Sequence, residues 1–124
     1  DELESAYNDE QGVTAAFNLN VLSVLNLKLG ANFKLGQFEH QAIFYQQDSQ
    51  IEMYLTSTTD QAIRFDKLDR QLKLRAGEKI HTEISRKYTL EGIESLLEQA
   101  GLQVLDHFEP ANEYFSLVMA RCCR

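Results

Sequence analysis

The order of apolar and polar residues divides the chain into stretches with different periods. In residues 13–29 apolar side chains recur at every third or fourth position, which predicts an amphipathic helix. Asp9 or Thr14 would cap its first turn, and Gly30 would end it in the left-handed conformation that glycine adopts readily. The residues expected on its packed face are Phe17, Val21, Val24, Leu25 and Leu29.

From Gln41 onward the period changes to two, which is typical of β-strands. A short helical turn over residues 34–38 comes before the first strand. We expect one antiparallel meander of about four or five strands, with Ile51, Met53 and Leu55 on the core face. The expected strands are QAIFYQQ, IEMYLTS, QAIRF, QLKLR and KIHTEIS.

The helical period returns after this meander. Thr89 is expected to cap a helix that Gly101 ends, and residues 102–108 and 114–122 then form a β-hairpin. The residues expected on the buried face of this helix are Leu90, Ile93, Leu96 and Leu97.

The last strand is apolar on both faces, which is typical of a strand inside a sheet that is covered on both sides. We therefore expect it to be under-covered in this chain, and to self-associate or to pair with a partner. The whole pattern predicts an α+β fold. Residues 1–86 form a helix with an antiparallel sheet, and residues 87–124 form a helix with a hairpin.

The strand KIHTEIS, residues 79–85, carries the first candidate chemistry. Regular alternation would direct Ile80, Thr82 and Ile84 toward the core, and the other side chains, Glu83 and Ser85 among them, the opposite way. The Glu83 carboxylate and the Ser85 hydroxyl would then lie roughly 7 Å apart along the strand. Such a pair can bind a ligand with two ring nitrogens, such as an imidazole, because a hydroxyl both donates and accepts. The plain alternative is a solvated strand face.

Composition narrows the classes of function. The 124 residues suffice for one domain with a sizeable core. The net charge of −7 and the lack of a Lys/Arg cluster argue against nucleic acid as a partner. The sequence contains no run of 18 apolar residues and therefore predicts no membrane-spanning helix. Cys122 and Cys123 are adjacent, and adjacent cysteines rarely form a disulfide with each other. This favours a reducing compartment and a cytoplasmic location.

Several other motifs and residues bear on function. No histidine or cysteine spacing indicates a metal site, and the six glycines are isolated, so no loop predicts a nucleotide cradle. Tyr7 lies in a stretch that is otherwise too polar to pack, and it is either a surface aromatic or a hydrogen-bond donor to an anionic ligand. Met53 is either core or the lining of a pocket. The chain starts at Asp1 without a methionine, which indicates a piece of a longer protein or a processed chain.

Three segments carry a resemblance to a known family. They are YNDEQGVTAAFNLNVLSVLN, FEHQAIFYQQDSQIEMYL and AGEKIHTEISRKYTLEGIESLLEQAGL, which together run from Tyr7 to Leu102. In order and spacing they resemble the C-terminal portion of the histidine-specific, S-adenosylmethionine-dependent methyltransferases. That family trimethylates the α-amino group of L-histidine and gives hercynine for ergothioneine synthesis.

The resemblance implies a role for six residues. The Glu and Ser of the family's TExS strand bind the substrate imidazole, which implies that role for Glu83 and Ser85. The Tyr of its AYxD segment binds the substrate carboxylate, which implies Tyr7. The Met of its IEM segment lies against the imidazole, which implies Met53. The residues carried over as pocket wall are Thr14 and Phe17.

The resemblance also implies partners that lie outside this chain. The family's cofactor lobe, a Rossmann-like sheet that binds S-adenosylmethionine, precedes the matched region, as does a substrate-binding Asn. Residues 87–124 would complete the edge of that sheet. A fungal branch methylates a tryptophan derivative, and the pair of Glu83 and Ser85 favours imidazole over indole, which has one ring nitrogen. The alternatives from other classes are a stand-alone binding domain without chemistry and a purely structural interaction domain.

Overall fold

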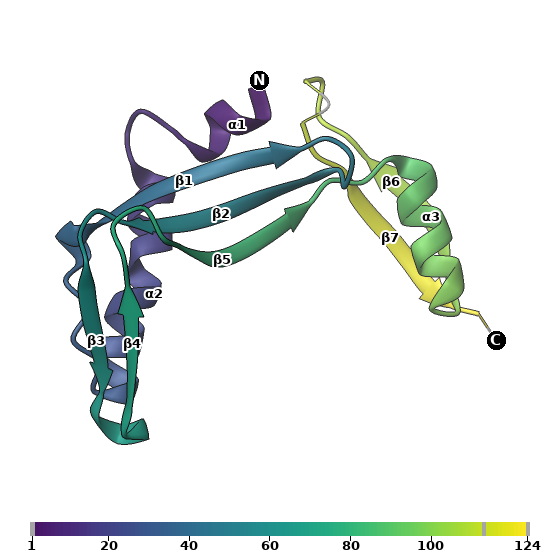
Figure 1. Cartoon of the computed structure of the whole chain (residues 1–124). Coiled ribbons are helices and arrows are strands. Elements are labelled where there is room, and N and C mark those ends of the chain that lie inside the picture. The colour runs from purple at the N-terminus through teal and green to yellow at the C-terminus, as the bar shows by residue number, and fades with distance from the viewer. Residues whose placement is uncertain (1, 113, 124) are drawn as a thin grey trace. The chain divides into compact units, whose positions relative to one another are not determined.

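The computed structural model describes residues 2–112 and 114–123 and confirms the predicted α+β class (Figure 1). The chain divides into two compact units, residues 1–87 and 88–124. In the described residues, no helix has the length and apolar character that crossing a membrane requires.

The first unit contains two α-helices, five strands and two 3₁₀ turns. In chain order they are α1 (Glu2–Tyr7), α2 (Val13–Leu29), η1 (Leu35–Gln37), β1 (Phe38–Tyr45), β2 (Gln50–Ser57), β3 (Gln61–Phe65), η2 (Asp66–Leu68), β4 (Arg70–Leu74) and β5 (Lys79–Arg86).

The five predicted strands are present, but they are divided between two sheets. β1, β2 and β5 form an antiparallel sheet with β2 in the centre, and β3 and β4 form a separate antiparallel hairpin (Figure 1). β5 takes the place beside β2 that β3 would hold in a sequential meander. As predicted, Ile51, Met53 and Leu55 of β2 share one face and are buried.

The ends of α2 follow the predicted capping chemistry. The Asp9 carboxylate accepts hydrogen bonds from the backbone N–H groups of Val13 and Thr14, both at 2.9 Å, and so satisfies two donors of the first turn. At the other end Gly30 adopts φ 62°. A Cβ at that position would also contact Asp66, so glycine suits both the turn and the packing.

The packed face of α2 is only partly the one that the sequence predicted, because Leu25 packs against the core but Phe17, Val21 and Val24 are exposed. Asn18 and Leu22 are its buried residues, and Leu19 and Leu25 pack beside them. The apolar stripe lies on the opposite, exposed side and consists of Val13, Phe17, Val21, Val24 and Leu27. The sequence misleads because the central buried position is polar: Asn18 Nδ2 donates to His40 Nδ1 and to the carbonyl of Tyr54, so its burial is compensated.

Two hydrophobic clusters form the core of the first unit. The larger joins α2 to both sheets and contains Leu22, Phe33, Phe38, Leu55, Ile63 and Leu74. The smaller lies under α1 and contains Ala42, Ile51 and Met53, with Leu3, Tyr7 and Phe44 packed against it.

The segment before Gly12 packs, contrary to the expectation that it is too polar. α1 is bound to the edge strand β1 by side chains that pair with the backbone. Asn8 exchanges two hydrogen bonds of 2.9 Å with the N–H and C=O of Ala42, and Glu4 accepts from the N–H of Phe44 at 2.8 Å. These polar residues thus replace a neighbouring strand, and they place Leu3 and Tyr7 over the smaller cluster.

The second unit consists of α3 (Leu90–Gln99) and the antiparallel hairpin of β6 (Leu102–Phe108) and β7 (Leu117–Cys122). Thr89 caps α3 as predicted, since its hydroxyl accepts from the N–H of Gly92 at 3.1 Å. Leu96, expected on the buried face, is exposed. β7 is shorter than the predicted strand, and β6 is its partner in the described part of the chain.

Candidate functional site

A β-bulge in β5 decides which way its candidate residues point. Met53 of β2 pairs with Glu83, but the next residue, Tyr54, pairs with His81. Thr82 is therefore an extra residue on β5, and its hydroxyl donates to the carbonyl of Met53 at 2.9 Å.

The bulge corrects the predicted facing of β5. Residues directly opposite each other on paired strands share a face. Glu83 and Ser85 are paired with Met53 and Ile51, so they lie on the core face together with Ile80, rather than opposite to it. Ile84 lies on the other face and is 53% exposed.

Tyr7 reaches the same face from the end of α1. Its hydroxyl lies 2.8 Å from Ser85 Oγ, across 78 residues of sequence. Its ring packs against the smaller cluster, to which Met53 belongs. Met53 is 2% exposed and lies opposite Glu83, so its side chain is buried on the same face as the carboxylate. Four of the six predicted residues therefore converge: Tyr7, Met53, Glu83 and Ser85.

Lys87, which the sequence pattern did not single out, completes this cluster. Its ammonium donates to Tyr7 Oη at 2.6 Å and to Ser85 Oγ at 2.9 Å, and it lies 4.5 Å from the centre of the Tyr7 ring. The available signal was the period of two, since Lys87 follows Glu83 and Ser85 at the same spacing. Only the fold brings Tyr7 to them.

The charges of the cluster act on Tyr7. Burial by itself raises the pKa of its phenol, and so does the carboxylate of Glu83. The hydrogen bonds from Lys87 and Ser85, together with the positive charge of Lys87, outweigh both, so the net pKa is lower than that of an ordinary tyrosine. Glu83 itself is exposed, and the cluster therefore combines an accessible anion with a part-buried cation.

A part-buried relay of hydrogen bonds supports the backbone at Tyr7. The Asn18 amide donates to His40 Nδ1 at 2.9 Å, so the other ring nitrogen, Nε2, carries the proton. That N–H donates to the carbonyl of Tyr7 at 2.8 Å. The relay connects α2 through β1 to the end of α1, and it holds Tyr7 next to β5.

Thr14 and Phe17 lie in the first turns of α2. The N–H of Thr14 belongs to the Asp9 cap, and Phe17 is 64% exposed on the apolar stripe. In the described residues, neither side chain makes a hydrogen bond or ring contact with Tyr7 or Ser85. Their role as pocket wall stays a prediction.

The opposite face of the sheet carries a separate polar group. Tyr54 donates a hydrogen bond to Glu52, and its ring stacks on His81 with centroids 4.8 Å apart. The hydrogen bonds from Tyr54 and Gln50 hold the pKa of Glu52 below its ordinary value. The Glu52 carboxylate in turn raises the pKa of Tyr54. The side chains of Gln50, Glu52 and Tyr54 thus satisfy one another's hydrogen bonds, as the polar groups of a stable strand face do.

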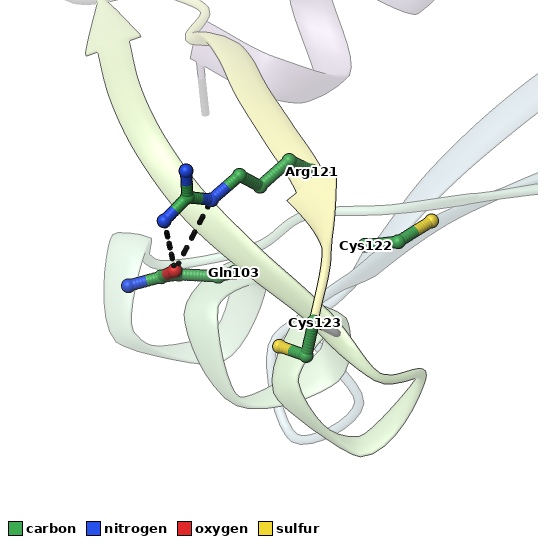
Figure 2. Close-up of a pocket in the computed structure, with 4 residues that line it drawn as sticks. All are labelled: Gln103, Arg121, Cys122 and Cys123. Atoms are coloured by element: carbon green, nitrogen blue, oxygen red, sulfur yellow. Dashed lines mark hydrogen bonds between the residues drawn. The ribbon is translucent and has the colours of Figure 1, made fainter.

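A depression in the second unit contains none of the predicted site residues. It is lined by Gln103, Arg121, Cys122 and Cys123 (Figure 2). Figure 2 shows Arg121 turned toward Gln103, and its guanidinium donates to the Gln103 side-chain oxygen from Nε at 3.4 Å and Nη2 at 3.1 Å. The described residues of the chain contain no group of three or more side chains suited to hold a metal ion.

Comparisons with known proteins agree on one family. The family model described as a histidine-specific, SAM-dependent methyltransferase matches residues 1–122. A histidine N-alpha-methyltransferase of Mycolicibacterium smegmatis is 42% identical over 113 residues, which cover 90% of this chain and 35% of that protein. A histidine N-alpha-methyltransferase of Mycobacterium tuberculosis is 40% identical over 100 residues, which cover 81% and 31%. The chain thus spans about a third of the length of these relatives.

Proposed function

We propose that this chain, which belongs to the family of histidine-specific, SAM-dependent methyltransferases, forms the substrate-binding part of a histidine Nα-methyltransferase. The whole protein would transfer methyl groups to the α-amino group of L-histidine and release hercynine, the precursor of ergothioneine. In this proposal the first unit recognises the amino acid. The second unit would extend the sheet of a cofactor lobe.

The observation that carries the proposal is the bulge at Thr82. It turns Glu83 and Ser85 onto the face that holds Met53 and receives Tyr7. An imidazole has an N–H that a carboxylate accepts and a second nitrogen that a hydroxyl satisfies. Glu83 and Ser85 offer these two groups, and the buried Met53 side chain lies opposite Glu83 on the same face of the sheet.

The reaction requires these residues to position the substrate rather than to act as an acid or a base. An α-amine is itself the nucleophile, and holding a reactant in a productive geometry contributes up to roughly 7–11 kcal/mol to catalysis. Glu83 favours a protonated imidazole, because a carboxylate beside a titrating base stabilises its charged form. The imidazole and carboxylate contacts would fix the direction in which the amine points.

S-adenosylmethionine would be bound outside these residues. It supplies the methyl group in the family's reaction. In residues 2–112 and 114–123 no turn between a strand and a helix carries a glycine-rich loop, and the glycine before α2 stands alone. The residues of this chain therefore do not fit the cofactor, and we assign it to the remainder of the longer protein.

The apolar stripe of α2 supports contact with that remainder. Its five residues, Val13, Phe17, Val21, Val24 and Leu27, are exposed along the full length of the helix. Exposed apolar patches of this kind mark interaction sites. Because the relatives are about three times as long as the matched region, we propose that the cofactor lobe of the same polypeptide covers this stripe.

Two measurements on a full-length protein that contains this chain test the proposal. The first follows transfer of labelled methyl groups from S-adenosylmethionine to histidine, with tryptophan as the competing substrate. Histidine should accept up to three methyl groups and tryptophan none. Transfer to tryptophan alone, or binding of histidine without any transfer, would refute the assignment.

The second measurement concerns the stripe. Val24→Asp should lower the melting temperature of the full-length protein markedly, because it places a charge in the proposed contact. Gln47→Asp, which introduces the same negative charge in an exposed turn of the first unit, is the control. Equal small effects of both changes would mean that the stripe stays in water.

A further inference from the structure

Lys87 is a part-buried cation without an ionic partner in the described residues. Two of its three N–H donors are engaged, one by Tyr7 and one by Ser85. Its contact with the Tyr7 ring offers a third, non-ionic interaction. In the described chain, no carboxylate lies within ion-pair distance of its nitrogen. One N–H and the charge itself therefore remain to be satisfied.

The backbone fixes this ammonium beside the sheet. The N–H of Lys87 donates to the carbonyl of Ser49 at 2.7 Å, which anchors the residue directly after β5. Tyr7 is held from the other side through Asn8 and the His40 relay. The hydroxyl and the ammonium that face each other are thus both positioned before any ligand binds, which is what a preorganised site requires.

We propose that Lys87 Nζ binds the α-carboxylate of the amino-acid substrate together with the Tyr7 hydroxyl. The inference rests on the proposed function and deepens it, because it names the group that makes a free carboxylate a requirement of the substrate. A carboxylate accepts several hydrogen bonds, and bonds between charged groups are the strong ones. The free N–H of Lys87 and the hydroxyl of Tyr7 are the two donors that such a group needs.

The charges along the strand support this orientation. Glu83, Ser85 and Lys87 follow one another on the same face, so the negative end of the cluster is at Glu83 and the positive end at Lys87. A zwitterionic histidine places its carboxylate away from Glu83, where like charges would repel, and toward Lys87. The imidazole then faces Glu83. A ligand bound the other way round would bring two anions together.

The test compares three ligands in the full-length protein. Histidine has the free carboxylate, histidine methyl ester has lost its charge, and histamine lacks the group. In the unchanged protein, calorimetry should give histidine the highest affinity. Lys87→Met should lower the affinity for histidine by about ten- to a hundred-fold, as removal of a charged hydrogen bond does. The affinity for histamine should stay the same.

Two further variants separate carboxylate binding from a role in orienting Tyr7. Lys87→Arg keeps the charge and should recover part of the affinity for histidine. Lys87→Met made in a Tyr7→Phe background should still lower the affinity for histidine, because the proposed hydrogen bond joins Lys87 directly to the ligand and does not depend on Tyr7. If Lys87→Met adds no loss in that background, Lys87 only positions Tyr7, and the inference is overturned.

The failure of this inference is distinct from the failure of the proposed function. If the unchanged full-length protein does not bind histidine at all, the proposed function falls, and the inference falls with it. If it binds histidine, but Lys87→Met weakens histidine and histamine equally or leaves both unchanged, only the role of Lys87 is refuted. The unchanged protein gives a check that needs no variant, because equal affinities for histidine and its methyl ester would also refute that role.

Discussion

Met53 and Glu83 lie directly opposite each other on β2 and β5, at the pair where the ladder between these strands slips by one residue. The buried thioether of Met53 and the accessible carboxylate of Glu83 thereby share one face of the sheet. A regular strand would have turned Glu83 away from Ile80. The bulge is the feature that brings an exposed carboxylate onto the face of the hydrophobic core at this point.

Glu83→Gln should reduce the affinity for histidine without a loss of stability. The carboxylate is exposed, so the fold does not depend on it, whereas a bond between a charged group and a ligand contributes about 1.5–3 kcal/mol. Calorimetry with histidine and a melting curve in the full-length protein measure the two effects. Glu39→Gln makes the same change on the opposite face of the sheet and is the control. Unchanged affinity in Glu83→Gln, with the fold intact, would return this strand to a plain solvated face.

Asn8→Ala should weaken the site without touching a ligand. The change removes both hydrogen bonds to the backbone of Ala42, which bind α1 to the edge of the sheet. At about 1 kcal/mol for each bond, α1 should detach part of the time and carry Tyr7 with it. Hydrogen exchange should accelerate at the amide of Ala42, and histidine affinity should fall. Asn20→Ala, an exposed change on α2, is the comparison, and equally fast exchange in both variants would contradict this role of Asn8.

Tyr7 should ionise at a lower pH than an ordinary tyrosine. The hydrogen bonds from Lys87 and Ser85 lower its pKa despite burial, so Lys87→Met should raise it above the ordinary value of about 10. The phenolate absorbance of the protein minus that of Tyr7→Phe reports this residue alone. Because the folded pKa is depressed, its stabilising effect is full above the unfolded pKa and is lost as the pH falls through the folded pKa. An identical midpoint with and without Lys87 would disprove the coupling.

Leu22→Ala and Val24→Ala should separate the two faces of α2 in the 124-residue chain. Leu22 is 1% exposed in the larger cluster, and its truncation should cost about 2–5 kcal/mol of unfolding free energy. Val24 lies on the exposed stripe, and its truncation should change that free energy by less than about 0.5 kcal/mol. Urea unfolding measures both. A larger loss for Val24 would restore the face that the sequence pattern had predicted.

Local signals in the sequence were sufficient for the elements themselves. The bounds of α2 follow from the Asp9 cap and from Gly30, which both act within a turn of the helix. The core face of β2 follows from strict alternation at Ile51, Met53 and Leu55. In each case the residues that decide the structure are neighbours in the sequence. The family resemblance, confirmed by the comparisons, suggested candidate site residues that alternation alone left open, and their roles stay a prediction.

What the sequence did not predict depends on partners far along the chain. The buried face of α2 is centred on Asn18, whose burial is compensated only by His40 and the Tyr54 carbonyl. The bulge at Thr82 is visible only in the register between β5 and β2. Lys87 joins the cluster only because the fold brings Tyr7, 80 residues away in the sequence, within hydrogen-bond distance of it. A pattern of apolar residues records none of these long-range hydrogen bonds.

The free edge of β7 should make the isolated 124-residue chain associate with itself. In the described residues β7 has β6 as its one neighbouring strand, so its other edge offers unpaired N–H and C=O groups. Leu117 and Met119 are exposed on this strand and add apolar surface. Such an edge can pair with a second copy, whereas in the full-length protein we expect the cofactor lobe's sheet to occupy it.

Light scattering over a range of concentrations measures this association. The isolated chain should shift from monomer to dimer, and Leu117→Lys should return it to monomer, because a charge on an edge strand opposes pairing. Gln71→Lys introduces the same charge on a strand of the first unit, in the β3–β4 hairpin, and should leave the dimer intact. A dimer that survives Leu117→Lys but not Val24→Lys would place the contact on α2 instead. A chain that stays monomeric at high concentration would show that the β7 edge is not adhesive.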